Sequence, residues 1–295
     1  MNGEMLLYGY KFARKISINF NYRTVLVPKG EYKIGHDIFQ FLYTFFGSRD
    51  FSNIYFDKGL GIMLNGMAMH GSEYEVFYLP PLVDVQESVK LLKKSLLGRL
   101  FQQIFSNEAA EMAIMQQTVQ EILAGRMNKV LEKYHMQCNC DTVNILDYGK
   151  LLSISGAGSE GDLQLNDVSQ YDVKRMVADI VGSLPVAKPR LLLAELPEYA
   201  LASEQVEAFM QMLVDSPIEY IIFLTQDESI LQFYNNIYYY HCIMPNGICS
   251  FEDWEEMAED GIDCDMEHIK QRIMKQFFSD IYDAGLKKYF KDNTR

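Results

Sequence analysis

Residues 190–195, RLLLAE, and residues 220–224, YIIFL, are two apolar runs of the length of a β-strand. Neither run alternates with polar side chains, which is typical of strands in a parallel sheet covered on both faces. Residues 203–214 between them repeat apolar side chains at helical spacing, with Ser203 as the expected N-cap. Strand, helix and strand at these intervals predict a right-handed β-α-β unit and therefore an α/β fold.

Further segments extend this unit on both sides. Residues 16–20 and 24–27 predict two strands, and residues 238–244 predict a third strand after the apolar pair. Residues 37–46 are apolar nearly all round and predict a buried helix. We expect Asp37 at the cap or in the first turn of that helix.

Residues 86–136 differ in kind from the rest of the chain. They contain no proline and two glycines, and their apolar side chains recur at helical spacing with a break at 106–107. This pattern predicts a hairpin of two amphipathic helices. We therefore expect four regions: a first part of a head domain (1–85), an α-helical leg (86–136), a second part of the head (137–244), and an acidic linker followed by an amphipathic C-terminal helix (245–295).

The net charge of −13 is unevenly distributed. Residues 1–135 carry 15 Lys and Arg against 13 Asp and Glu, and the remaining residues carry 12 against 27. A nucleic-acid binder with a uniformly basic surface is excluded, although one with a local basic surface is not. A solvated, solubilising surface explains the acidic half equally well.

The location of the protein is predicted from three absences. There is no apolar run of about 18 residues that could cross a membrane. The first residues lack the basic and apolar regions of a secretory signal. The five cysteines are odd in number and scattered, so we expect reduced thiols in a cytoplasmic protein with no membrane partner.

Residues 30–37, GEYKIGHD, have the frame of a phosphate-binding loop, with Gly30 and Gly35 five positions apart between a predicted strand and a predicted helix. The two residues that would contact the ligand are replaced. His36 stands where a lysine would meet the outer phosphates, and Asp37 stands where a Ser or Thr would hold magnesium. A carboxylate at that point repels phosphate, so we expect poor phosphate binding.

The stretch from residue 190 to residue 202 resembles ABC-type and SMC-type ATPases, in which an apolar strand ends in Asp-Glu-Pro. In those families the Asp helps to bind magnesium and the Glu polarises the attacking water. Here Ala194 has the Asp position, and of the two acids Glu195 alone is present. Gln226 follows the next strand where those families have a γ-phosphate-sensing His, and the helix expected over 167–184 lacks their Ser-Gly-Gly. The resemblance implies an ATPase-like head that is not an enzyme and binds no ATP.

An ATPase-like head without these nucleotide-contacting residues, combined with a short helical leg, resembles the accessory protein of type II-A CRISPR adaptation, the Csn-two family. The resemblance covers about residues 14–244. The matching segments are 24–27, 76–85, 143–147, and the paired runs 191–193 and 221–224.

This resemblance implies an α/β fold with a degenerate P-loop (ABC/SMC-like) head, a short inserted α-helical leg and a C-terminal helical extension. It implies a ring-shaped homotetramer that threads double-stranded DNA ends through its centre during CRISPR spacer acquisition, without nuclease activity. It also implies bound calcium, and partnership with the CRISPR integrase pair and the effector nuclease.

DNA binding requires Lys or Arg side chains that face phosphates, and the expected leg helices carry two groups of them. Each group is spaced so that its members share a helix face. No aromatic side chains interleave with them, so binding is expected to be independent of sequence. Basic groups with this spacing are also typical of the solvent-exposed face of an amphipathic helix that binds no DNA. The candidate DNA contacts are Lys90, Lys93, Lys94, Arg126, Lys129 and Lys133.

Candidate calcium ligands are the carboxylates of Asp141, Asp147 and Glu160, in the region where the resembled family is acidic. Calcium takes six to eight oxygen ligands, and this region of the chain has few carboxylates. Two other functions stay open. One is a divergent SMC-type or recombination-type ATPase, for which Glu195 is the supporting residue. The other is an acidic scaffold that binds protein and no DNA.

Overall fold

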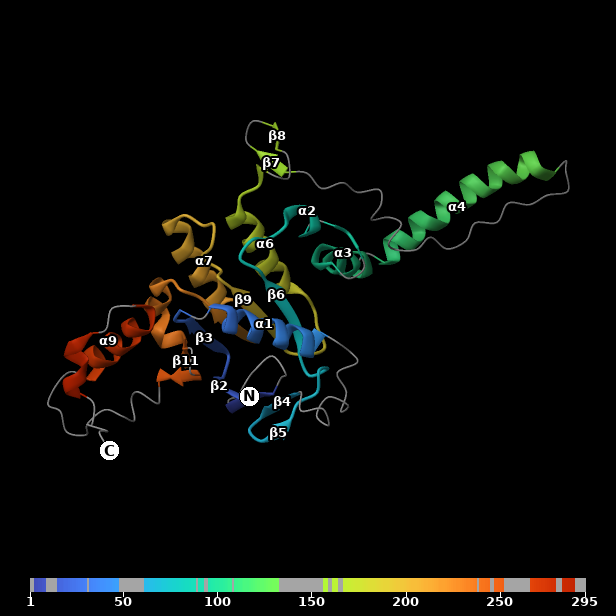
Figure 1. Ribbon diagram of the computed structural model, residues 1–295. Coiled ribbons are helices and arrows are strands. Elements are labelled where there is room, and N and C mark those ends of the chain that lie inside the picture. The colour runs from blue at the N-terminus through green and yellow to red at the C-terminus, as the bar shows by residue number, and fades with distance from the viewer. Residues whose placement is uncertain are drawn as a thin grey trace. The chain divides into compact units, whose positions relative to one another are not determined.

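The computed structural model divides the chain into two compact units, one formed by residues 1–83 and 185–295 and the other by residues 84–184 (Figure 1). The residues that the structure describes are 3–8, 15–30, 32–47, 61–88, 90–92, 95–107, 109–132, 156–158, 161–163, 167–237, 239–244, 247–251, 266–279 and 283–289.

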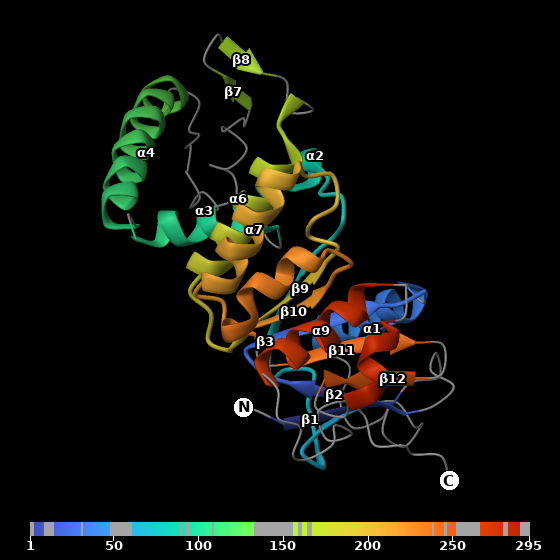
Figure 2. The same cartoon turned by 90° about the vertical axis from the view of Figure 1, so that its left-hand side faces the viewer.

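The first unit is built on a six-stranded sheet with the strand order β12-β11-β3-β10-β9-β6. Its strands are β3 (Arg23–Pro28), β6 (Glu75–Leu79), β9 (Arg190–Glu195), β10 (Tyr220–Leu224), β11 (Tyr239–Met244) and β12 (Gly247–Ser250). All neighbouring strands are parallel except β12, which pairs antiparallel with β11 at the edge (Figure 2). Every residue of β3, β9 and β10 is buried, so the expected α/β architecture with a covered parallel sheet is confirmed.

The helix α7 (Ser203–Asp215) joins β9 to β10, as the β-α-β unit requires. Its N-cap is Ala202 and not the predicted Ser203. The Ala202 N–H donates to Oε1 of Gln205 at 3.1 Å, so a side chain inside the first turn supplies the acceptor at this end. The guanidinium of Arg23 ties β3 to the end of the same unit by donating to the carbonyl oxygens of Val214, Ser216 and Ile218.

The helix α1 (Tyr32–Gly47) begins five residues before the predicted start. Asp37 therefore lies inside the helix and does not cap it. A second, antiparallel sheet explains why this helix is apolar nearly all round. That sheet has the order β2-β1-β4-β5 and consists of β1 (Gly3–Tyr8), β2 (Ile16–Phe20), β4 (Gly61–Leu64) and β5 (Met67–Ala68). Phe39 and Leu42 of α1 share one buried core with residues of both sheets, such as Ile62 and Leu193.

The C-terminal segment forms two helices where one amphipathic helix was expected within residues 245–295. These are α9 (Met266–Phe278) and the 3-10 helix η5 (Ala284–Tyr289). The Arg272 guanidinium bonds the Asp283 carboxylate at 2.5 and 3.0 Å and holds the two helices together. Another 3-10 helix, η4 (Glu228–Asn236), precedes β11 and contacts α9.

The second unit contains α2 (Val85–Ser88), α3 (Leu96–Asn107), α4 (Ala109–Leu131), α6 (Gln170–Ser183), and the short strands β7 (Gly156–Gly158) and β8 (Gly161–Leu163). The predicted break between two leg helices is found between α3 and α4. The first predicted helix is interrupted, because residues 90–92 are not helical. Ser169 caps α6 by accepting from the Asp172 N–H. Within the described ranges of the chain, no helix combines the length and apolar character needed to cross a bilayer.

Candidate functional site

The candidate site is centred on Glu195, the last residue of β9, whose side chain has no exposed surface. Its carboxylate accepts three hydrogen bonds from side chains. The hydroxyls of Tyr32 and Tyr78 donate one each. Nδ1 of His36 lies 2.7 Å from Oε1 of Glu195. A carboxylate only accepts hydrogen bonds, so this contact places a hydrogen on Nδ1 of the histidine.

The three donors come from two elements beside β9. Tyr32 and His36 are four residues apart on α1 and so share one face of its first turns. Tyr78 lies on β6, the strand next to β9. Burial raises the pKa of Tyr32 and of Tyr78, and the hydrogen bond to Glu195 raises both further. Both phenols therefore stay neutral and keep donating to the carboxylate at physiological pH.

In this structure the Glu195 carboxylate is enclosed by the side chains that donate to it. A general base must reach the water that it activates, and Glu195 has no solvent contact. The residue that would share magnesium with it is Ala194, which is also fully buried. The group that sequence reasoning assigned to catalysis in the ATPase families is here an internal acceptor that ties α1 and β6 to the end of β9.

The two glycines of the predicted phosphate loop have structural roles. Gly30 has φ +72°, a left-handed conformation that L side chains rarely adopt. Gly35 lies within α1, where a Cβ atom would approach Cδ1 of Leu224 to 2.6 Å, so glycine lets the helix pack closely on β10. Since α1 starts at Tyr32, the residues Gly35, His36 and Asp37 are helical and do not form a loop. Gly30 is thus favoured by its backbone conformation and Gly35 by its packing against Leu224.

A strained turn follows Glu195. Leu196 and Ala200 have φ values of 40° and 60°, which are unusual for residues other than glycine. The turn carries the partly buried Glu198, whose Oε1 accepts from the backbone N–H of Gln226 at 2.9 Å. Nε2 of Gln226 lies 3.5 Å from the Pro28 carbonyl oxygen. Gln226 thus links the ends of β3, β9 and β10, where the ATPase families have their phosphate sensor.

Burial raises the pKa of Glu198, and the neighbouring Asp227 carboxylate raises it as well, while the bond from Gln226 lowers it. A carboxyl group with a raised folded-state pKa binds its proton more tightly in the folded than in the unfolded chain. Stability therefore falls as pH rises from the ordinary glutamate value through the folded pKa. We expect the free energy of unfolding of Glu198→Gln to decrease less with rising pH than that of the original protein. The stability of the variant relative to the original protein should therefore increase with pH. Urea unfolding from about pH 5 to about pH 8 measures the difference.

Glu207→Gln, an exposed change on α7, is the control and should follow the original protein at every pH. Parallel stability curves for Glu198→Gln and the original protein would show that Glu198 titrates normally in the folded state.

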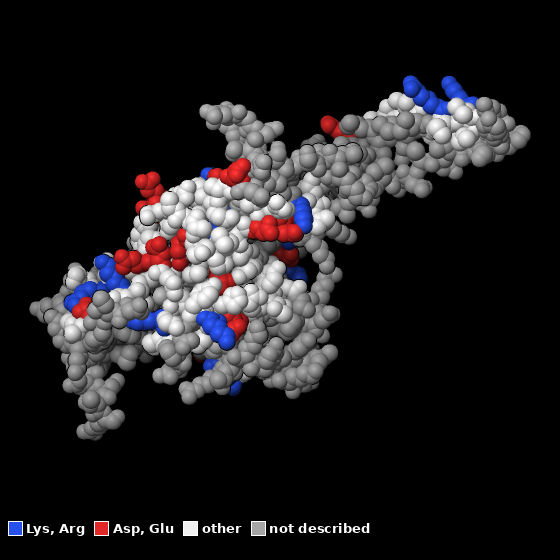
Figure 3. All heavy atoms as spheres, turned by 45° about the horizontal axis from the view of Figure 1, so that its top comes forward, with Lys and Arg blue, Asp and Glu red and all other residues white. Residues whose placement is uncertain are grey.

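The predicted DNA contacts are only partly within the described residues. Arg126 and Lys129 are exposed and lie three residues apart on α4. Basic side chains project near the end of this helix in Figure 3, whereas elsewhere on the visible face they stand singly or beside acidic ones. Lys90 lies in the non-helical residues 90–92 and its ammonium pairs with Glu87. The helical face predicted for Lys90, Lys93 and Lys94 is therefore interrupted at its first member; Lys93, Lys94 and Lys133 lie outside the described residues.

The predicted calcium ligands Asp141, Asp147 and Glu160 also lie outside the described residues. Among the residues that are described, no group of three or more His, Cys, Asp or Glu side chains could hold a metal ion.

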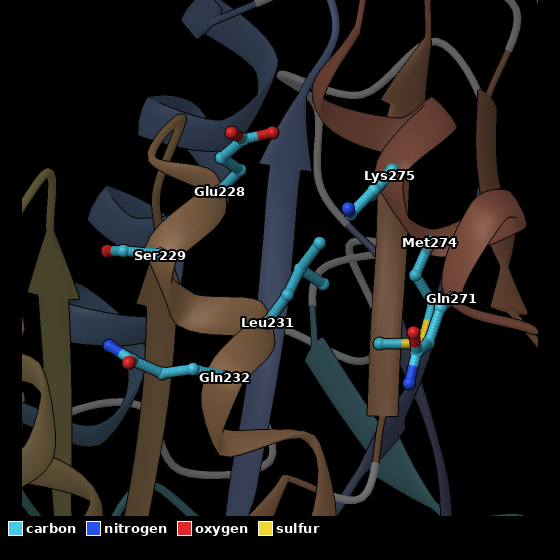
Figure 4. A pocket seen from close by; sticks show the side chains of 7 residues that line it. All are labelled: Glu228, Ser229, Leu231, Gln232, Gln271, Met274 and Lys275. Carbon is cyan, nitrogen blue, oxygen red and sulfur yellow. The ribbon is translucent and has the colours of Figure 1, made fainter. Parts of the chain in front are cut away.

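A pocket of about 400 Å³ lies between η4 and α9 (Figure 4). Glu228 and Leu231 line it from η4, and Met274 and Lys275 line it from α9. Its rim carries one acidic and one basic side chain, so it does not favour either an anion or a cation. None of the site residues predicted from the sequence lines it.

Comparison with known proteins gives structural matches only. No protein-family model matches the chain, and no curated protein matches its sequence. Stu0660 of Streptococcus thermophilus has a similar structure, with a TM-score of 0.67 and 15% identity over 92% of this chain and 84% of that one. The two proteins therefore share a fold.

Two ATP-binding proteins are less similar. They are the ATP-binding cassette MJ0796 bound to ADP and Pi (TM-score 0.38, 10% identity, 79% of this chain and 91% of that one) and a bacterial Atm1-family ABC exporter with ATP bound (TM-score 0.32, 12% identity, 78% and 36%). These TM-scores are too low to establish a common fold.

Of the residues that surround Glu195, the sequence pointed to His36 alone. Tyr32 and Tyr78 were missed, because the predicted start of α1 left Tyr32 in a loop and because strand order cannot be derived from spacing. The four-residue interval between Tyr32 and His36 was the available signal, and it is informative only once the helix is known to begin at Tyr32.

Proposed function

We propose that this chain is a non-catalytic protein that binds double-stranded DNA ends without regard to sequence and takes part in CRISPR spacer acquisition, an adaptive antiviral defence. The observation that carries the proposal is the enclosed carboxylate of Glu195. It stands in the sequence where the resembled ATPases have their catalytic glutamate, and its burial and its three hydrogen-bond partners support a head that does not hydrolyse ATP. A head of this kind is what the resemblance to the type II-A adaptation accessory proteins implies.

The fold shared with Stu0660 supports the proposal because the match covers most of both chains. A match over 92% of the chain is longer than residues 1–83 and 185–295 together, so it includes residues of the second unit. Head and helical insertion together are what the resembled family combines.

Binding to DNA would use phosphate contacts from exposed basic residues such as Arg126 and Lys129 on α4. Two charges per chain bind duplex DNA weakly. A homotetrameric ring would repeat them around a channel and so raise the local positive potential, although the net charge of the whole chain is −13. Calcium and contacts with the CRISPR integrase pair and effector nuclease belong to the same proposal.

A gel-shift experiment tests the proposal with one duplex in two forms, linear and covalently closed. Each form is titrated with protein in low salt, with calcium and with a chelator. We expect a shift of linear DNA alone, because a ring must be threaded by an end, and a stronger shift with calcium. Equal binding to both forms would indicate a surface clamp. Absence of binding in low salt, where electrostatic affinity is greatest, would exclude DNA binding and leave a protein scaffold.

A further inference from the structure

Two cysteines stand opposite each other at the edge of the main sheet. Cys242 on β11 and Cys249 on β12 are direct partners in the antiparallel register. Directly opposite residues of such a pair have Cα atoms roughly 4.5–5.5 Å apart and side chains on the same face. Disulfides span Cα separations of roughly 4.4–6.8 Å. The register therefore places the two Cα atoms at a separation that a disulfide can span, and neither Cys242 nor Cys249 is in a disulfide.

The two thiols differ in their surroundings. Cys242 is 2% exposed, whereas Cys249 is only partly buried and its Sγ lies 3.6 Å from the Ser250 carbonyl oxygen. Burial raises the pKa of Cys242 to about 11, which the positive charge of Lys29 partly opposes and the nearby Cys249 reinforces. Cys249 is therefore the thiol that an oxidant in solution reaches first, and Cys242 is placed behind it.

We propose that Cys242 and Cys249 form a redox-responsive dithiol that closes to a disulfide with a small-molecule disulfide such as oxidised glutathione. The Cys249 thiolate attacks one sulfur of the oxidant, which forms a mixed disulfide and releases one glutathione thiolate. Cys242 then gives up its proton to solvent and attacks Sγ of Cys249, which releases the second glutathione. Two protein thiols are oxidised by two electrons in all, and one oxidised glutathione is reduced to two thiols.

The position of the pair gives the bridge a structural consequence. β12 is the edge strand of the sheet and is held there by its pairing with β11. A disulfide between the two strands would lock this pairing and keep the edge from opening. While β12 stays in place, the β11 edge that it covers remains paired and does not expose its backbone N–H and C=O groups. The thiol–disulfide balance around the protein would therefore control how stably β12 pairs with β11.

The test uses the full chain with Cys138, Cys140 and Cys264 replaced by serine, so that the pair alone contributes thiols. The folded protein is titrated with oxidised glutathione, and free thiols and adducts are measured by alkylation and mass spectrometry. We expect both thiols to disappear together, with a loss of two hydrogens and no lasting glutathione adduct. In a version that also carries Cys242→Ser, Cys249 should keep one glutathione adduct, because no second thiol resolves it.

Peptide mapping of the unsubstituted protein gives an independent measurement if the serine replacements disturb folding. A disulfide-linked pair of peptides containing Cys242 and Cys249 is expected within one chain. The proposal is wrong if the folded protein keeps both thiols under conditions that oxidise the unfolded chain. It is also wrong if the adduct on Cys249 persists while Cys242 is present, or if the bridge joins two chains.

Discussion

Replacing Arg126 and Lys129 together by glutamate is expected to weaken binding to linear duplex DNA at least about tenfold near 0.1 M salt. Both side chains are exposed on α4, three residues apart. Each phosphate contact that is lost removes the release of roughly one counterion, so the slope of log affinity against log salt falls by about 2 for each chain that binds. A competition titration at several salt concentrations measures the affinity and the slope together.

The matched control replaces two exposed lysines elsewhere by glutamate, namely Lys33 on α1 and Lys188 before β9. It changes the net charge by the same amount, so a general electrostatic effect would appear equally in both proteins. We expect the control to bind much more tightly than the α4 variant. Equal affinities would mean that α4 does not face DNA, and unchanged affinity in the α4 variant would assign binding to other residues. The structure of each variant is checked by its thermal midpoint, since both changes are on the surface.

The strands of the main sheet could be predicted because their side chains are apolar on both faces. The runs at β9 and β10 have no polar alternation, and a covered parallel sheet is the arrangement in which such strands are stable. The order of those strands could not be predicted, because it depends on packing between distant segments. Tyr78 contacts Glu195 only because β6 pairs with β9.

The predicted start of α1 was wrong for a related reason. Gly30 and Gly35 suggested a loop, but Gly35 is needed where α1 lies against Leu224, a contact that the local sequence does not reveal. Residues 90–92 show the opposite error, since apolar residues at helical spacing did not make a continuous helix there. The cysteine pair was described as scattered thiols, because its opposition follows from the register of β11 and β12.

Glu195→Gln is expected to destabilise the protein strongly and to leave nucleotide hydrolysis absent in both forms. Hydrogen bonds to a charged partner contribute about 1.5–3 kcal/mol each, and the Glu195 carboxylate accepts from Tyr32, His36 and Tyr78. A glutamine has one acceptor oxygen and turns an NH₂ group toward the remaining donors. We expect a loss of about 3 kcal/mol, which lowers the thermal midpoint by roughly 6–12 °C.

Exposed Glu207 on α7 provides the control, because Glu207→Gln changes the same functional group where nothing encloses it. Its thermal midpoint should stay within about 1 °C of the original protein. Tyr78→Phe removes one hydrogen-bond donor, and its thermal midpoint should lie between those of Glu195→Gln and Glu207→Gln.

A working ATPase would behave differently. Its catalytic glutamate contacts the attacking water, so replacement by glutamine would abolish ATP turnover with little loss of stability. ATP hydrolysis by the original protein that disappears in Glu195→Gln, with an unchanged thermal midpoint, would overturn the non-catalytic interpretation of the head.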